Sequence, residues 1–261
     1  MRVAILDDYQ DCIRTLDAYK LLAGHEVTVF NDPAGDETSL ARRLAPFEAI
    51  VLIRERTPFP ASLIAKLPNL KLLSQTGKNA PHIDYAECSK RGIVVSAGGG
   101  GGHSTSELTW AMILGALRHI PDEVAALRAG RWQTTLGRAV AGRTLGVLGY
   151  GRLGSDVARI GKAFRMNVLV WGREGSRERA ARDGFEIAPS KDALFERADV
   201  LSVHVLLRAE SRGLVTRADF ARMKPDALFV NTSRAGLIER GALFEALKAG
   251  RPGSAAIDVF D

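Results

Sequence analysis

The sequence contains few cysteines and no long apolar run. Cys12 and Cys88 are its two cysteines, and because they lie far apart we expect free thiols in a reducing, cytoplasmic compartment. No apolar run approaches the roughly 20 residues that a membrane-spanning helix needs. The first residues form a short strand pattern ended by acids, which is not the architecture of a signal peptide. The sequence therefore predicts no membrane partner.

Patterns typical of metal and nucleic-acid sites are absent as well. Neither the two cysteines nor the five histidines have the spacing of metal ligands. The net charge is +6, but the basic residues are scattered and no basic block interleaves with aromatics, which argues against nucleic acid as a partner. The charge either reflects a generic basic surface or attracts small anions such as a dinucleotide or a carboxylate.

The first hundred residues alternate short apolar runs with helical stretches. The predicted strands are Val3–Leu6, Glu26–Phe30, Ala49–Ile53, Lys71–Ser74 and Ile93–Val95. The predicted helices are Leu16–Ala23, Glu37–Leu44, Ala61–Leu67 and Tyr85–Arg91. Such alternation predicts a parallel sheet covered by helices on both faces. The fold class is therefore α/β, and residues 1–100 are expected to form a flavodoxin-like domain.

Five consecutive glycines at positions 98–102 mark the expected boundary to a second domain, residues 101–261. The glycine run serves either as a linker or as a loop that approaches the cofactor closely. An apolar helix over Thr105–His119 follows and ends before Pro121. The strands predicted beyond it are Leu145–Leu148, Val168–Trp171, Val200–Val203, Ala227–Val230 and Ala255–Val259. The helices predicted between them are Arg152–Phe164, Arg177–Arg182, Asp192–Glu196 and Arg240–Ala249. This is the order of a Rossmann domain.

A glycine-rich turn connects the first strand of this second domain to its first helix. The residues expected to bind a dinucleotide there are Gly149, Gly151, Arg152, Leu153 and Gly154. Gly149 permits the tight turn, Gly151 lets the backbone approach a pyrophosphate, and Gly154 lets the helix pack on the strand. The pyrophosphate is expected at the helix N-terminus, where N–H groups and the helix dipole favour negative charge. An ordinary glycine loop is the alternative.

The end of the next strand bears on the choice between NADP and NAD. An acidic residue at this place holds the ribose 2′-hydroxyl in NAD-binding folds, but here the position is Gly172, followed by Arg173. The guanidinium of Arg173 suits a 2′-phosphate, so we favour NADP over NAD. Two alternatives remain: Arg173 is a solvated loop arginine, or Glu174 takes the role of the acid after a shift in register.

Segments throughout the chain resemble one enzyme family. They include Ala198–His204, Phe220–Gly236 with its Asn-Thr-Ser-Arg sequence, and Ala255–Asp261 with its Asp-Val-Phe sequence. In the N-terminal half, Thr76–Asn79 and Arg91–Val95 also match. The chain resembles the D-isomer-specific 2-hydroxyacid dehydrogenases, the family of phosphoglycerate dehydrogenase and glyoxylate/hydroxypyruvate reductase, over essentially its whole length.

The resemblance implies hydride transfer between NAD(P)H and a small 2-oxo or 2-hydroxy acid. It implies that Arg234 is the catalytic arginine that binds the substrate carboxylate and carbonyl. Its place after a predicted strand agrees, because ligands bind at the carboxyl ends of strands in open α/β sheets. The cofactor-lining residues that it implies are His204, Val205, Thr232 and Asp258. The substrate-binding residues are Gly77 and Lys78, with Arg54 and Arg56 as weaker candidates.

The family's catalytic glutamate and histidine, one more sheet strand and a returning C-terminal segment would all follow Asp261, where the sequence as given ends. We therefore expect a C-terminally truncated member, which a fragment, an unseen tail or a natural truncation would each explain. Without a positioned general acid the rate is expected to fall by roughly 10²–10⁴. The alternative function is an NAD(P)-binding pseudoenzyme, sensor or co-repressor-like protein without turnover. A homodimer through the apolar helix Thr105–His119 is also expected.

Overall fold

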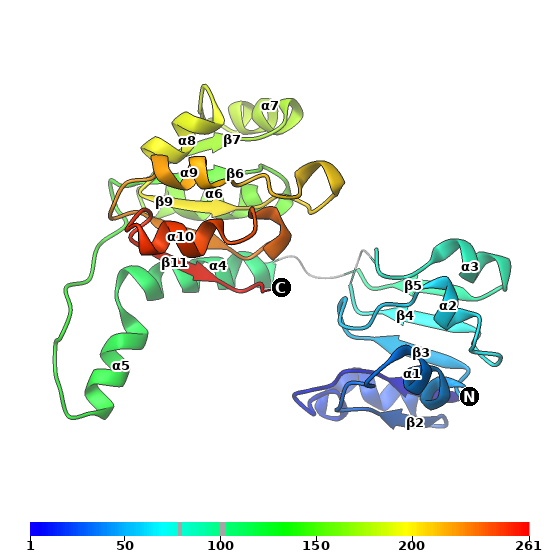
Figure 1. Ribbon diagram of the computed structural model, residues 1–261. Coiled ribbons are helices and arrows are strands. Elements are labelled where there is room, and N and C mark those ends of the chain that lie inside the picture. Colours follow the sequence, from blue (N-terminus) through cyan, green and yellow to red (C-terminus); the bar gives the residue numbers. More distant parts are fainter. Residues whose placement is uncertain (78–79, 100–102, 261) are drawn as a thin grey trace. The chain divides into compact units, whose positions relative to one another are not determined.

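The computed structural model describes residues 1–77, 80–99 and 103–260, and the chain forms two compact units, Met1–Gly101 and Gly102–Asp261 (Figure 1). Each unit contains one fully parallel sheet with helices packed on it. The predicted α/β class is therefore confirmed. Among the described residues, no helix is both long and apolar enough to cross a membrane.

The sheet of the first unit has the strand order β2-β1-β3-β4-β5, which is the flavodoxin-like order. Its strands are β1 (Arg2–Ile5), β2 (Glu26–Val29), β3 (Ala49–Leu52), β4 (Leu72–Gln75) and β5 (Val94–Ala97). The helices α1 (Glu37–Leu44), α2 (Ala61–Ile64) and α3 (Tyr85–Lys90) share one apolar core with the sheet. Carboxylates start two of these helices: Asp36 accepts from the N–H of Ser39 at 2.7 Å, and Asp84 caps α3 in the same way.

The α-helix predicted over Leu16–Ala23 is not present, and this prediction was wrong. Two short 3₁₀ helices, Ile13–Thr15 and Asp17–Leu22, occupy this stretch. None of their residues is buried, and the side chain of Leu21 is 83% exposed. Because no apolar face is buried, tertiary packing does not stabilise an α-helix here.

The sheet of the second unit has the order β11-β10-β9-β6-β7-β8, the doubly wound order of dinucleotide-binding folds. Its strands are β6 (Thr144–Leu148), β7 (Asn167–Trp171), β8 (Glu186–Ile187), β9 (Val200–Val203), β10 (Leu228–Asn231) and β11 (Ser254–Ile257). The two-residue edge strand β8 was not predicted. The central strands are nearly continuous in apolar residues because both of their faces are covered.

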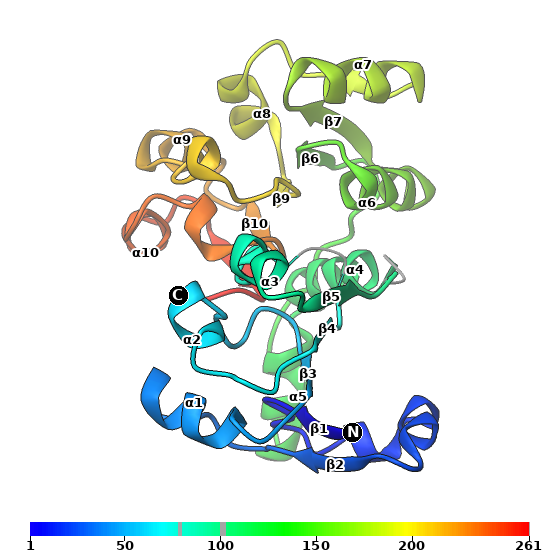
Figure 2. The same ribbon diagram turned by 90° about the vertical axis from the view of Figure 1, so that its right-hand side faces the viewer.

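Helices cover the two faces of this sheet (Figure 2). On one face lie α4 (His103–Leu117) and α6 (Arg152–Ala163), and α7 (Glu174–Arg182) contributes Ala180 to the same core. On the other face lie α8 (Lys191–Arg197), α9 (Arg217–Arg222) and α10 (Ala242–Lys248). Helix α7 begins three residues earlier than predicted, so that Arg173 is its N-cap and Glu174 its first residue.

The predicted helix Thr105–His119 is α4, which ends at Leu117, and a helix that was not predicted follows it. This helix, α5 (Ile120–Arg128), begins after His119, which adopts a left-handed conformation (φ 52°). The sequence pattern predicts a helix end before Pro121, but proline is tolerated in the first turn of a helix, and Pro121 lies in the first turn of α5. Trp110, Ile113 and Leu117 of α4 are buried in the core of their own unit, whereas Leu108 is exposed.

Candidate cofactor and substrate site

The glycine-rich turn at the end of β6 is held by very close backbone packing. Gly149 has φ +94°, and a Cβ built on it would lie 2.5 Å from the carbonyl oxygen of His204. A Cβ on Gly154, within α6, would lie 2.1 Å from the carbonyl oxygen of Gly149. Both positions therefore require glycine for the fold itself. Gly151 is different, because its Cβ would have no atom within 4 Å.

Open space above Gly151 adjoins the N-terminus of α6. Gly151 is the N-cap and supplies no side-chain cap, so the N–H groups at the start of the helix, on Arg152, Leu153 and Gly154, have no acceptor within it. The positive end of the helix dipole lies at the same place. An uncapped helix start beside a glycine that the fold does not require fits the pyrophosphate of a dinucleotide.

His204 and Val205 follow β9 and lie against this turn. The N–H of His204 donates to the carbonyl of Leu148 at 2.8 Å, and a methyl group of Val205 lies 2.9 Å from the position of a Cβ on Gly149. The ring Nε2 of His204 is 2.8 Å from the hydroxyl of Ser202, whereas its buried Nδ1 has no partner among the described residues. Burial lowers the pKa of His204 to about 4, so the ring is neutral at neutral pH.

The turn after β10 presents Arg234 at the edge of the sheet. The amide of Asn231 fixes this turn, since its Nδ2 donates to the carbonyl of Arg234 at 3.0 Å and its Oδ1 accepts from the N–H of Ser233 at 2.9 Å. The hydroxyl of Ser233 donates to the carbonyl of Val203 at 2.7 Å, which ties the turn to β9. Arg234 is exposed, and its Nη1 donates to the carbonyl of Ser233 at 2.7 Å.

Thr232 is buried in the same turn, and its hydroxyl oxygen is 2.8 Å from that of Thr109 on α4. Thr109 donates its single hydroxyl hydrogen to the carbonyl of Thr105 at 2.7 Å. Thr232 must then donate to Thr109, which leaves its oxygen as an acceptor. Sequence reasoning missed Thr109, because a threonine within an apolar helix shows no pattern that singles it out.

Asp258 follows β11, and its N–H donates to the carbonyl of Asn231 at 3.1 Å. Its side chain is exposed. The glycine turn, His204, Thr232 with Arg234, and Asp258 thus stand at the carboxyl ends of β6, β9, β10 and β11, which are consecutive neighbours in the sheet. This is the edge at which open α/β sheets bind ligands.

Arg173 stands at the carboxyl end of β7, on the other side of β6, with its side chain 65% exposed. Its Nη2 is 3.1 Å from Oε1 of Glu210, which lies in a 3₁₀ turn, Ala209–Ser211, after β9. Glu210 was not among the predicted site residues, because no local pattern indicates a contact across 37 positions.

The candidate substrate residues of the first unit lie after β3 and β4. The N–H of Arg54 donates to the hydroxyl of Thr76 at 3.0 Å, and the Gln75 amide donates to the carbonyl of Arg54 at 2.8 Å. Gly77 follows, with the Gln75 amide nitrogen 3.5 Å from the position of its Cβ. Arg54 has φ 58°, an uncommon conformation that often occurs at functional sites. Lys78 falls outside the described residues.

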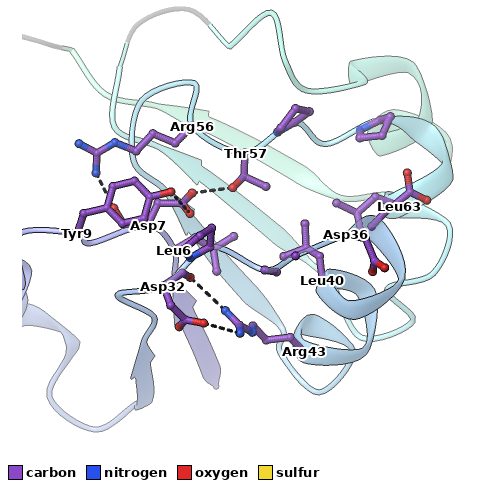
Figure 3. Close-up of a pocket in the computed structure, with 16 residues that line it drawn as sticks. Leu6, Asp7, Tyr9, Asp32, Asp36, Leu40, Arg43, Arg56, Thr57 and Leu63 are labelled. Carbon is purple, nitrogen blue, oxygen red and sulfur yellow. Dashed lines mark hydrogen bonds and ion pairs between the residues drawn. The ribbon is translucent and has the colours of Figure 1, made fainter.

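A cavity of about 340 Å³ lies nearby in the same unit, among residues that follow β1, β2 and β3 (Figure 3). Arg56 lines it, and Arg54 does not. Arg56 donates to the carbonyl of Asp7 and stacks on Tyr9, with its Cζ 4.9 Å from the ring centroid. The acidic lining residues are Asp7, Asp32, Asp36 and Glu37, and the basic ones are Arg43 and Arg56. This excess of carboxylates is poorly suited to a carboxylate substrate.

The two kinds of glycine in the turn predict opposite results on substitution. Gly151→Ala is expected to change the free energy of unfolding by less than about 0.5 kcal/mol, because its methyl group meets no atom. The same methyl would occupy the open space above Gly151, where the pyrophosphate is expected, and weaken NADH binding about tenfold or more. Gly154→Ala is expected to cost about 3 kcal/mol of stability. Denaturant unfolding and a fluorescence titration with NADH measure both effects; equal destabilisation by the two variants would contradict this assignment.

The buried ring of His204 predicts a stability that depends on pH. Its pKa is about 4 in the folded chain and about 6.5 when unfolded, so between these values the unfolded state binds a proton that the folded state does not. Stability should fall as the pH falls from about 6.5 to 4, by about 2 kcal/mol between pH 7.5 and 5. His204→Gln should lose this part of the pH dependence in denaturant unfolding. If stability falls equally with pH in the variant and the parent, other groups cause the pH dependence.

Comparison with known proteins identifies the family of this site. The model of the D-isomer specific 2-hydroxyacid dehydrogenase NAD-binding domain matches residues 110–261. The chain is 37% identical to a D-3-phosphoglycerate dehydrogenase of Archaeoglobus fulgidus over 91% of its own length and 45% of that protein's. It is 35% identical to a glyoxylate reductase of Aeropyrum pernix, covering 94% of this chain and 76% of the relative.

Among solved structures, a phosphoglycerate oxidoreductase from Vibrio cholerae O395 matches with a TM-score of 0.95 and 51% identity, over 100% of this chain and 84% of that one. The chain spans less than half the length of the Archaeoglobus phosphoglycerate dehydrogenase. The family model covers more than half of the chain, and relatives more than 30% identical cover most of its length. The chain therefore belongs to the D-isomer specific 2-hydroxyacid dehydrogenase family.

Proposed function

We propose that the protein is an NAD(P)-dependent oxidoreductase that transfers a hydride between the nicotinamide and a small, D-configured 2-hydroxy acid or its 2-oxo form. The observation that carries this proposal is the turn after β10, in which the Asn231 amide holds Arg234 at the same sheet edge as the glycine turn. An arginine there presents a planar pair of donors that suits the carboxylate of a 2-oxo acid.

Within this proposal each residue at the edge has a role. Arg234 binds the substrate carboxylate and polarises the carbonyl. The N–H groups of the glycine turn hold the pyrophosphate, while His204, Val205, Thr232 and Asp258 line the rest of the cofactor. Because Thr232 donates to Thr109, its oxygen is available as an acceptor for an amide N–H. The nicotinamide supplies or accepts the hydride when it is bound.

The first unit is proposed as the substrate domain, residues 1–100, and the second as the cofactor domain, residues 101–261. Gly77, Lys78 and Arg54 are the proposed substrate contacts of the first domain. The relatives named glyoxylate reductase and D-3-phosphoglycerate dehydrogenase indicate small 2-oxo acids as the first substrates to try. The free thiols Cys12 and Cys88 support the proposed cytoplasmic location.

Both nicotinamide dinucleotides are candidates, and NADP is the proposed preference. The position that carries an acid in NAD-binding folds is Gly172, and the guanidinium that follows it favours a 2′-phosphate. The matching family model is described as NAD-binding, so NAD remains the competing cofactor.

Turnover and binding together test the proposed function. NADPH and NADH are titrated against the chain by protein fluorescence, and oxidation of each is then followed with glyoxylate and hydroxypyruvate. The parent chain is expected to turn over, and Arg234→Gln is expected to lose this turnover while its Kd for the cofactor is unchanged. The matched control is Arg240→Gln, an exposed arginine nearby in sequence that lies outside the proposed site. Absence of binding by either dinucleotide would overturn the proposal.

A cofactor-binding protein without turnover is the second candidate. The state of His204 favours it, because this buried ring, with a pKa of about 4, does not donate a proton at neutral pH. In that case the titrations give binding of NADPH or NADH, but no 2-oxo acid is reduced. The same experiment therefore separates the two candidates.

We also propose a homodimer, with α5, the helix that directly follows α4, at the interface. Ile120, Val124 and Leu127 recur at helical spacing along one face of α5, and each is at least 44% exposed. Trp132 and Leu136, in the segment that follows, are 72% and 91% exposed. Figure 1 shows α5 projecting away from the sheet of its own unit. An apolar arm of this kind is typical of a surface that pairs with a second copy.

A charge on this arm should separate the proposed dimer. Leu127→Lys is expected to halve the mass measured by light scattering while leaving the folded unit intact, because the side chain is 57% exposed. Leu21→Lys, at a leucine that is 83% exposed in the first unit, is the matched control and should leave the mass unchanged. A parent protein that is monomeric at all concentrations would contradict the dimer.

A further inference from the structure

The end of β7 leaves little room for the acidic residue that many NAD-binding folds place there. Gly172 occupies this position, and a Cβ built on it would lie 3.3 Å from Cβ of Ser176 and 3.5 Å from Cα of Gly149. The glycine turn and the start of α7 thus crowd the site. Gly172 itself supplies no carboxylate, so a carboxylate that acts at this place comes from another residue.

Glu210 provides such a carboxylate. Its Oε1 lies 3.1 Å from Nη2 of Arg173, although the two residues are 37 positions apart. Arg208 approaches the same oxygen at 3.9 Å. Hydrogen bonding to its own backbone N–H, and then to Arg173, lowers the pKa of Glu210, so the carboxylate stays ionised. Two guanidinium groups therefore share one carboxylate.

The turn that carries Glu210 is held in place by Ser211. The hydroxyl of this buried serine accepts from the N–H of Arg208 at 2.8 Å and donates to the carbonyl of Leu206 at 2.7 Å. The position of the Glu210 backbone thus follows from hydrogen bonds to the buried hydroxyl of Ser211. The carboxylate meets Arg173 without any ordering of the loop that carries it.

We propose that Glu210 determines the choice between NADPH and NADH by competing with a ribose 2′-phosphate for Arg173. This inference rests on the proposed function. A guanidinium beside the adenosine ribose attracts a 2′-phosphate, and a carboxylate already bound to that guanidinium weakens the attraction and repels the phosphate. NADH lacks the phosphate and is little affected. Glu210 is thus a specificity-determining residue that acts through Arg173 and restrains a preference for NADPH.

The alternative is an ordinary surface ion pair, since both side chains are more than half exposed and such pairs contribute little to stability. An ordinary pair would affect both dinucleotides equally or not at all. The ratio of the two dissociation constants therefore separates the two interpretations.

The test measures Kd for NADPH and NADH with the parent chain, Glu210→Gln, Arg173→Ala and the double variant. Glu210→Gln should tighten NADPH binding by about two- to fivefold, the range expected when an exposed pair is released, and change NADH binding by less than about twofold. Arg173→Ala should weaken NADPH and remove any effect of Glu210→Gln. Added salt should reduce the NADPH difference, because the interaction is between exposed charges.

Glu186→Gln is the matched control. Glu186 pairs with Arg197 at 2.7 Å, and its side chain is 55% exposed, close to the 58% of Glu210. This control should leave both constants unchanged. Glu210→Asp keeps the charge on a shorter side chain, so its Kd for NADPH should lie between those of the parent and Glu210→Gln. It provides a second variant if the Gln substitution lowers stability.

Equal changes in both constants, or an effect of Glu210→Gln that persists in Arg173→Ala, would overturn the role of Glu210 while leaving the proposed function intact. If the parent chain binds neither dinucleotide, the proposed function fails, and the inference fails with it.

Discussion

The candidate site of the second unit depends on the close approach of three backbone segments where β6 ends. The carbonyl of His204 and that of Gly149 come so near to neighbouring glycines that a single Cβ would overlap them, at 2.5 Å and 2.1 Å. Helix α6 can therefore begin directly against the sheet, with its N–H groups at the edge. The residues after β9 are fixed by the same contact, and the turn after β10 is tied to β9 through Ser233. The positions of the other site residues thus depend on the backbone packing between the Gly149 turn, His204 and the start of α6.

Charge at this edge is arranged around anions. The start of α6 and the guanidinium groups of Arg234 and Arg173 contribute positive potential, whereas the nearby imidazole of His204 is buried and neutral. Two carboxylates also lie at this edge: Asp258 follows β11, and Glu210 pairs with Arg173 beside the end of β7. A ligand with phosphates near the start of α6, and with a further anionic group near Arg173 or Arg234, matches this order of charges.

Sequence reasoning predicted those features that depend on short-range pattern. The strand order follows from alternating strands and helices, and the glycine turn is a local signature in its expected context. Contacts between distant residues were not predictable in this way: Thr109 meets Thr232 across 123 positions, and Arg173 meets Glu210 across 37. The sequence also could not distinguish Arg54 from Arg56, because the two side chains are identical. Only the path of the backbone decides that Arg56, and not Arg54, lines the cavity of the first unit.

Two errors in secondary structure have opposite causes. Leu16–Ala23 has the composition of a helix, but no apolar face of it is buried, and 3₁₀ turns result. Pro121 suggests the end of the preceding helix, yet it lies in the first turn of a new helix, α5. Missing burial explains the first error, and a first-turn position that tolerates proline explains the second.

Helix α5 is anchored weakly within its own chain, because Ala126 is the buried residue among its nine. A helix of this length is marginal in water without packing. In the proposed dimer most of its stabilisation would come from the second copy, so that ordering of the arm and association become one equilibrium. Its protection from proteases and from amide hydrogen exchange would then rise with protein concentration, while the sheet behind it would stay protected at any dilution.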